Sequence, residues 1–277
     1  MRVIAVANQK GGVAKTTTCV NLASEFALLP DQPRRVLVID IDAQASATSS
    51  VFGNTDRSKS MYDVMAGPTP IEEIIEHSEE FGFDIAPADI LLSGVELQVA
   101  QIMGREKILS KKIKHLAYDA IFIDTPPSLG LLTVNALTAA DTVLVTICPE
   151  YFSLRGIALL EKTVETVREQ LDSPVAIGGV LITRYRDRVV TREAEKIIRD
   201  YFGDRVFKTM IAENIRLEEA HNAHLPISRY DSASKGAQAY RELVNEILNG
   251  HPMWGHVIEP QRHEEHEEHK EDEEMKG

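Results

Sequence analysis

A loop near the N-terminus combines residue types that bind phosphate. Residues 10–17 read Lys-Gly-Gly-Val-Ala-Lys-Thr-Thr, directly after an apolar run and directly before a helical pattern. Glycines let backbone N–H groups close around phosphate oxygens, and the N-terminus of the following helix favours negative charge. In such a loop Lys15 neutralises the β- and γ-phosphates and the Thr16 hydroxyl coordinates Mg²⁺. The strict pattern G-x-x-x-x-G-K-[ST] is not met, because Gln9 and Ala14 occupy its glycine positions. A flexible turn before an ordinary helix is therefore the alternative interpretation.

Three aspartates end two further apolar runs. Asp40 and Asp42 lie at the end of the run that starts at residue 35, and Asp124 ends the run 120–124. A single aspartate after a strand is usually a turn residue or a helix cap. Three carboxylates at the same sheet edge as a lysine-containing loop instead favour a site for Mg²⁺ and a nucleotide.

The elements that must position these residues alternate along the chain as in repeated βα units. We expect strands over residues 2–7, 35–40, 83–86, 120–124, 142–147, 176–183 and 206–210, and helices over 15–29, 93–109, 131–139, 154–171, 191–202 and 235–248. Strands this apolar on both faces belong in a parallel sheet that helices cover on each side. The sequence therefore predicts a single α/β domain with a doubly wound, mostly parallel sheet and helices on both faces.

The length and charge of the chain set its domain limits. A chain of 277 residues with 43% hydrophobic residues can fill a full-sized core. We expect the domain to span residues 1–250 and residues 251–277 to form a disordered acidic tail rich in His and Glu. Its histidines at spacing three could hold a metal weakly if the segment became helical. Residues 259–277 carry −6 of the formal net charge of −13, so the rest of the chain carries −7.

The cysteines and the hydropathy pattern predict a cytoplasmic protein. Cys19 and Cys148 lie in apolar runs without a partner at metal-ligand or redox-motif spacing, as buried thiols in a reducing compartment do. No apolar stretch approaches the roughly 18 residues that cross a bilayer. The last helical pattern runs into Pro252 and the acidic tail, which anionic lipid would repel, so we expect no membrane binding.

Over residues 1–250 these motifs resemble the ParA/MinD family of deviant Walker A ATPases, most closely its ParA/Soj branch of chromosome and plasmid partition proteins. The family loop is K-G-G-V-G-K-T-T, its second strand ends in D-x-D-P-Q-G, and its motif D-x-P-P-S-L-G-x-L-x-x-N-A-L matches residues 124–137. Residues 211–220, 225–227 and 234–240 look like C-terminal blocks of that branch. The resemblance implies a P-loop NTPase fold and hydrolysis of ATP with Mg²⁺.

The resemblance also implies residue roles. Lys10 matches the signature lysine that reaches the nucleotide of the other subunit, Asp42 the carboxylate that positions the attacking water, and Asn214 a residue that contacts the base. The implied catalytic residues are Lys10, Lys15 and Asp42. The implied nucleotide-binding residues are Lys10, Gly11, Gly12, Val13, Ala14, Lys15, Thr16, Thr17 and Asn214. Mg²⁺ is expected to bind Thr16 directly, and Asp40, Asp42 and Asp124 through water.

Several positions depart from the family pattern. Alanine replaces glycine at Ala14 and Ala45, alanine replaces proline at Ala43 and Ala212, and threonine replaces proline at Thr146. None of these changes removes a charged group. We therefore expect nucleotide binding to survive with an altered affinity or rate.

The resemblance further implies a homodimer with ATP, non-specific DNA binding on the nucleoid and a ParB-like protein that stimulates hydrolysis. The candidate DNA-binding residues lie late in the chain: Arg184, Arg186, Arg188, Arg192 and Arg216. From the residues alone, a solvated helix face is an equal alternative. A positioning ATPase for a cargo other than DNA and a nucleotide-binding module with impaired hydrolysis are further alternatives. A nucleotide-gated reductase or carrier subunit would need paired cysteines for an Fe–S cluster, which the sequence does not supply.

Overall fold

Parallel strands form the centre of the computed structural model, which describes residues 1–30 and 32–254. The strands of the sheet lie in the order β3-β4-β2-β5-β1-β6-β7-β8, and all neighbours are parallel except β3 and β4. Their bounds are β1 (Arg2–Ala7), β2 (Val36–Asp40), β3 (Glu76–Ser78), β4 (Phe83–Ala86), β5 (Ala120–Asp124), β6 (Thr142–Ile147), β7 (Ala176–Tyr185) and β8 (Val206–Ala212). This sheet confirms the predicted doubly wound, mostly parallel α/β fold.

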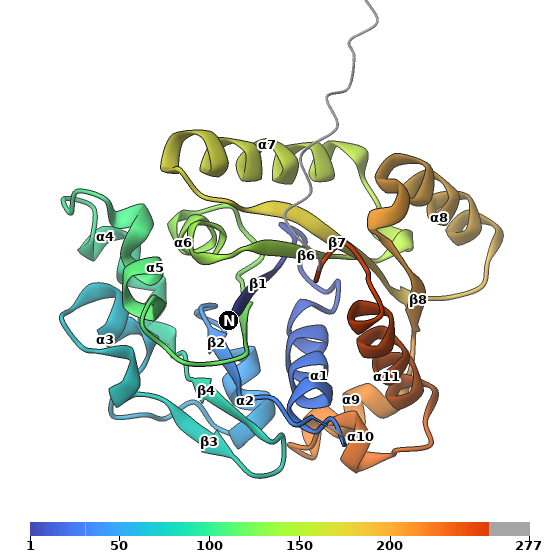
Figure 1. The fold of residues 1–277 in the computed structure, drawn as a ribbon, viewed down its shortest axis with the longest axis horizontal. Helices are drawn as coiled ribbons and strands as arrows, with labels where there is room; N and C mark the ends of the chain where they lie inside the picture. The colour runs from blue at the N-terminus through green and yellow to red at the C-terminus, as the bar shows by residue number, and fades with distance from the viewer. Residues whose placement is uncertain (31, 255–277) are drawn as a thin grey trace, which may run out of the picture.

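Helices cover both faces of the sheet (Figure 1). One face carries α3 (Met61–Ala66), α4 (Val95–Gln98), α5 (Ile108–Ile113), α6 (Leu131–Ala139), α7 (Leu154–Leu171) and α8 (Val189–Phe202). The other carries α1 (Lys15–Ala27), α2 (Ser46–Phe52), α9 (Ile215–Asn222), α10 (Ile227–Tyr230) and α11 (Lys235–Leu248). Alternation along β1 explains the two cores, since Val3 and Ala5 pack into the first and Ile4 and Val6 into the second.

The chain differs from the predicted elements mainly where helices are short. The prediction of a single helix over residues 93–109 is wrong. A 3₁₀ turn (Ile90–Gly94), α4, a second 3₁₀ turn (Arg105–Lys107) and α5 occupy this region instead. Gly104 takes a φ of +71° between α4 and α5, and this left-handed residue ends any continuous helix. The sequence patterns also missed β3, α2, α3, α9 and α10.

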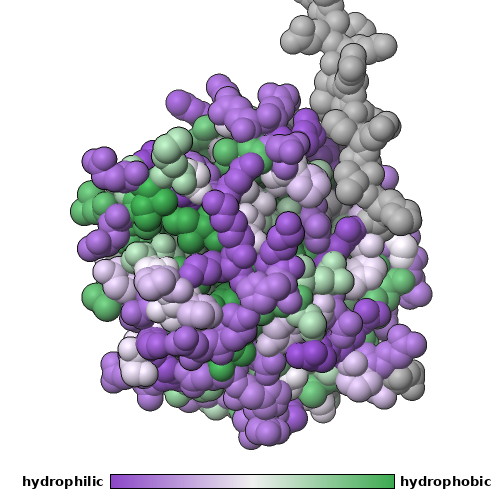
Figure 2. Space-filling model, turned by 60° about the vertical axis from the view of Figure 1, so that its left-hand side comes forward, coloured by the Kyte–Doolittle hydropathy of each residue, from purple (hydrophilic) through white to green (hydrophobic). Residues whose placement is uncertain are grey.

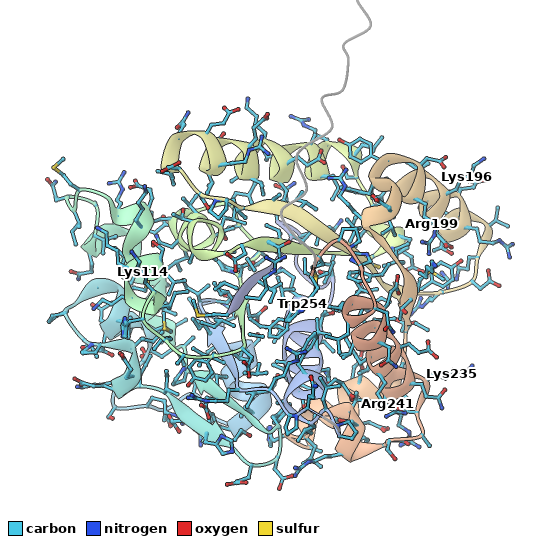
Figure 3. The ribbon with its side chains drawn as sticks, viewed as in Figure 1. Lys114, Lys196, Arg199, Lys235, Arg241 and Trp254 are labelled. Carbon is cyan, nitrogen blue, oxygen red and sulfur yellow. The ribbon has the colours of Figure 1, made fainter. Side chains whose placement is uncertain are left out.

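The first four residues of the predicted tail pack onto the domain. His251 and Met253 are buried, and the His251 ring stacks on Phe207 at 3.7 Å between centroids. Trp254, which Figure 3 labels, stacks on Phe26 at 5.0 Å between centroids. The boundary expected after residue 250 is therefore too early. Residues 255–277, including the three histidines at spacing three, lie outside the described residues.

Several exposed apolar side chains lie in the segments on either side of α4 and within it. Figure 2, which turns the α4 side forward, shows hydrophobic atoms gathered on this face. The exposed large apolar residues in this part of the chain are Ile90, Leu91, Leu97, Ile102 and Met103. Within the described ranges, no helix is long and apolar enough to span a membrane. Cys19 and Cys148 are both buried thiols, as predicted.

Candidate nucleotide-binding site

The lysine-containing loop lies between β1 and α1, at the carboxyl edge of the sheet. Gly12 and Ala14 take left-handed φ angles of +72° and +60°, and Ala14 is the N-cap residue of α1. A left-handed backbone is free of strain for glycine but destabilises an alanine by about 1 kcal/mol. The loop therefore keeps a glycine conformation at Ala14, although this position carries a methyl group.

The two lysines of the loop lie in different surroundings. Lys15 is buried, and its Nζ donates a hydrogen bond to the Lys10 carbonyl oxygen at 3.1 Å. Burial lowers the pKa of Lys15, while the charges of Asp124 and Asp42 oppose this shift. Lys10 is exposed and lines a separate cavity of about 500 Å³ beside the start of α7. The structure thus places Lys15 within the site and Lys10 on its outer side.

The three aspartates meet as the strand pattern predicts. β2 and β5 are adjacent, and Asp40 pairs with Asp124 in the strand register. Both side chains are fully buried, and Asp42 is nearly so. Thr16 Oγ1 donates to Asp124 Oδ2 at 2.6 Å, which joins the loop to β5.

Burial controls the electrostatics of these carboxylates. It raises the pKa of Asp40 to about 6, although hydrogen bonds from the Thr48 backbone and hydroxyl favour the charged form. Burial and the charge of Asp40 also raise the pKa of Asp124 well above its usual range. Buried carboxylates that repel each other become stable when a cation neutralises them.

The donor set fits Mg²⁺. The Asp124 Oδ1 atom is buried without a hydrogen-bond partner, and the Thr16 hydroxyl lies beside the same carboxylate. Over residues 1–30 and 32–254, no three acidic, His or Cys side chains close around a single metal position. Direct binding of the ion by Thr16, and binding through water by the aspartates, stay predictions.

A cavity of about 600 Å³ opens beside the loop. One end is lined by loop residues and Asp42, namely Gly11, Gly12, Ala14, Lys15, Thr16, Thr17 and Asp42. The other end is lined by β8, the turn after it, α9 and α11, namely Ile211, Ala212, Glu213, Asn214, Leu217, Glu218, His221, Asn222 and Tyr240. A cavity of this size with one cationic and one partly apolar end matches a nucleotide.

The structure also places the remaining predicted residues. Asn214 lines the cavity and caps α9, its Oδ1 accepting from the Arg216 N–H at 2.9 Å. Val13 is buried behind the loop, and Asp40 and Asp124 lie beneath the cavity without lining it. Sequence reasoning missed Gln44, Ser46, Pro127, Glu218, His221 and Tyr240 as lining residues. Gln44 and Pro127 lie within the aspartate motifs, so their place in those motifs was a usable signal.

Three of the five positions that depart from the family pattern, Ala14, Ala45 and Ala212, line the cavity or lie between residues that line it. Ala45 is the N-cap of α2 with a left-handed φ of +50°, like Ala14. Ala212 lines the far end of the cavity. Thr146 is buried in β6 with its hydroxyl lacking a partner, and its carbonyl accepts from the Asn8 side chain at 2.8 Å.

The candidate DNA-binding arginines all contact carboxylates. Arg186 pairs with Glu213 and Glu150, Arg188 with Glu150 at 3.0 Å, Arg192 with Asp187 at 3.0 Å, and Arg216 with Glu219 at 2.7 Å. Arg184 differs from the others because it lines the cavity. Lys196 and Arg199 on α8 and Lys235 and Arg241 on α11 lie on the same side of the molecule (Figure 3).

The fold and the site together define a P-loop nucleotide-binding protein. β1 lies inside a parallel sheet, the loop after it opens α1, and the neighbouring β5 supplies the carboxylate that holds the loop threonine.

Several known proteins are similar to this chain in sequence or in structure. The family described as an AAA domain matches residues 1–177. Chromosome partitioning protein ParA of Caulobacter vibrioides is 39% identical over 255 residues, which cover 90% of this chain and 94% of that protein. Sporulation initiation inhibitor protein Soj of Bacillus subtilis is 39% identical over 250 residues, covering 89% and 98%. Cobyrinic acid a,c-diamide synthase from Mycobacterium smegmatis, solved with a bound ATP analog and magnesium, gives a TM-score of 0.78 at 33% identity, covering 90% of this chain and 94% of that chain. This chain belongs to the ParA/Soj family of P-loop ATPases, as its motifs predicted.

Proposed function

We propose that this protein is a Mg-ATP-dependent ATPase that dimerises around nucleotide, binds DNA without sequence preference, and drives partition or positioning of DNA with a ParB-like activator. One observation carries the ATPase part of the proposal. Lys15, Thr16 and Asp42 line one cavity of nucleotide size, and buried carboxylates that need a cation lie beneath it. The similarity to ParA and Soj supports the partition part.

The residues of the chain divide the chemistry between them. Lys15 exchanges its hydrogen bond to the Lys10 carbonyl for a phosphate oxygen, because a buried ammonium binds a charged acceptor more strongly than a neutral carbonyl. Thr16 would hold Mg²⁺, which when bound would neutralise part of the negative charge of the phosphates. Asp42 accepts the Gln44 N–H at one oxygen, Oδ1, at 3.0 Å, and we assign its carboxylate to positioning the attacking water.

The dimer and DNA parts depend on residues outside the cavity. Lys10, exposed beside α7, is proposed to contact the nucleotide of the second subunit. Arg186, Arg188, Arg192 and Arg216 are proposed to contact DNA phosphates, which would replace Glu150, Glu213, Asp187 and Glu219 as partners. Two copies side by side double this otherwise weak surface.

Phosphate release and nucleotide binding test the proposal. We expect the native protein to hydrolyse ATP with Mg²⁺, Lys15→Ala to lose ATP binding, and Asp42→Ala to bind ATP without hydrolysing it. A hydrolysis-competent Asp42→Ala variant would remove Asp42 from its assigned role.

A second candidate is a nucleotide-binding module with impaired hydrolysis. The observation that favours it is the left-handed backbone of Ala14 and Ala45, where strain and an added methyl lie beside the phosphate end of the cavity. ATP binding by the native protein without phosphate release would favour this second candidate.

A further inference from the structure

The backbone of Arg184 is unusual for an arginine. Its φ is +49°, in the left-handed region that glycine favours. The pairing of β7 with β8 is irregular between Ile182 and Tyr185, on either side of this residue. Strained residues and bulges concentrate at functional sites, where they redirect a side chain.

The strained backbone sends two successive side chains to one loop. Thr183 Oγ1 donates to the Val13 carbonyl at 3.0 Å, and an Arg184 terminal nitrogen donates to the Gly12 carbonyl at 3.2 Å. In a regular strand, neighbouring side chains point to opposite faces of the sheet. The left-handed turn at Arg184 therefore explains how both residues reach the phosphate loop.

Arg184 also reaches the base end of the cavity. Its second terminal nitrogen lies 3.3 Å from Glu213 Oε1, and the Glu213 N–H donates to the Tyr185 carbonyl at 3.1 Å. Glu213 precedes Asn214, the predicted base-contacting residue. The guanidinium thus spans the cavity wall from Gly12 to the turn after β8.

The cavity lining holds more acidic than basic side chains, so a second cation beside Lys15 would favour the binding of phosphate. The lining holds the acids Asp42, Glu213 and Glu218 against Lys15 and Arg184, not counting histidine. Mg-ATP adds negative charge to this already acidic set. A guanidinium carries five N–H donors in a planar fork that matches phosphate oxygens.

We propose that Arg184 is a nucleotide-site residue that binds the phosphate chain of bound ATP with its charged guanidinium, rather than a DNA-binding residue. The Gly12 carbonyl and Glu213 hold the side chain beside the cavity. The inference rests on the proposed function, because it takes ATP as the ligand of the cavity. The alternative is that Arg184 only fixes the phosphate loop through its hydrogen bond to the Gly12 carbonyl, for which an uncharged donor would be sufficient.

Two substitutions separate these roles. Arg184→Gln keeps N–H donors but removes the charge, and Arg184→Lys keeps the charge but loses the fork. Arg229→Gln is the matched control, since Arg229 is exposed, pairs with Glu80 and does not line the cavity. Calorimetry measures Mg-ATP affinity, and competition against a fluorescent ATP analogue measures Mg-tripolyphosphate and adenosine.

We expect Arg184→Gln to weaken ATP and tripolyphosphate about tenfold, the loss typical of one charge-assisted contact, and to leave adenosine unchanged. Arg184→Lys should recover most of the loss, and Arg229→Gln should bind all three ligands normally. Native affinity of Arg184→Gln for tripolyphosphate would overturn the inference, as would an equal loss for adenosine. Failure of the native protein to bind ATP would instead overturn the proposed function.

Discussion

Asp40 is a buried carboxylate whose charge depends on the ligand of the site. Burial raises its pKa to about 6 in the folded protein, against about 3.9 in an unfolded chain. Because the folded state binds the proton more tightly, the contribution of Asp40 to stability falls as the pH rises from about 4 to about 6. Below that window the contribution is absent, and above it the penalty of the buried charge is complete.

A carboxyl ¹³C titration measures this pKa directly. We expect a midpoint for Asp40 near pH 6 without nucleotide, and a lower midpoint with Mg-ATP because the cation stabilises the carboxylate. An Asp40→Asn sample assigns the signal. A midpoint near pH 4 in the nucleotide-free protein would show that this carboxylate is not desolvated as the structure indicates.

Ala14 stands in a backbone conformation made for glycine. We expect Ala14→Gly to leave the free energy of unfolding unchanged or slightly higher, because relief of about 1 kcal/mol of left-handed strain offsets the greater freedom of glycine in the unfolded chain. Chemical denaturation checks this. The control Ala194→Gly lies within α8 and should cost about 1 kcal/mol. Equal losses in both variants would contradict the left-handed geometry at Ala14.

At the scale of elements, the segment after α11 completes one core. Met253 is fully buried, and Trp254 stacks on Phe26 of α1. We expect deletion of residues 251–277 to lower stability by at least about 3 kcal/mol, the typical cost of removing a large buried side chain. Deletion of 259–277 keeps these contacts and should leave the melting temperature close to the native value. Equal melting temperatures for the two truncated proteins would refute the packing of this segment.

The turn between β6 and α7 masks part of the proposed DNA surface. Glu150 pairs with Arg188 at 3.0 Å and with Arg186 at 3.6 Å. We expect Glu150→Gln to raise DNA affinity several-fold, because DNA phosphates no longer compete with this carboxylate and one repulsive charge is gone. The control is Glu76→Gln, which removes one negative charge from β3, where Glu76 pairs with Arg57. A fluorescence anisotropy titration measures the DNA affinity of both variants. A similar gain in both variants would assign the effect to net charge alone.

Across the whole molecule, local patterns predicted the sheet and the phosphate end of the site. The strands of the parallel sheet are apolar on both faces, so their positions and their polar ends could be read from the sequence. The sequence also predicted that Asp40 and Asp124 would lie near each other, because the carboxyl ends of parallel strands share one edge of the sheet.

Features that depend on tertiary contacts or on one backbone angle could not be predicted in this way. The packing of Trp254 needs Phe26, which lies far away in the sequence. The short α2 and α9 bury too few residues to give a clear helical period. The turn of Arg184 toward Gly12 depends on a single φ angle that no residue pattern encodes.

The whole molecule is proposed to act as a dimer that joins nucleotide to DNA. The acidic chain repels DNA, so the arginines proposed to contact DNA should bind it measurably only when two copies present them together. Nucleotide, dimer and DNA binding are therefore expected to appear together, and Lys10 connects them through the second subunit.

Sedimentation of Asp42→Ala, with and without ATP and with non-specific duplex DNA, tests this central claim most directly. The account predicts a monomer without ATP, a dimer with Mg-ATP, and a complex with DNA only when ATP is present. The dimer and the DNA complex should both be lost in the double variant Lys10→Ala, Asp42→Ala. A monomer in saturating Mg-ATP, or equal DNA binding with and without nucleotide, would contradict it.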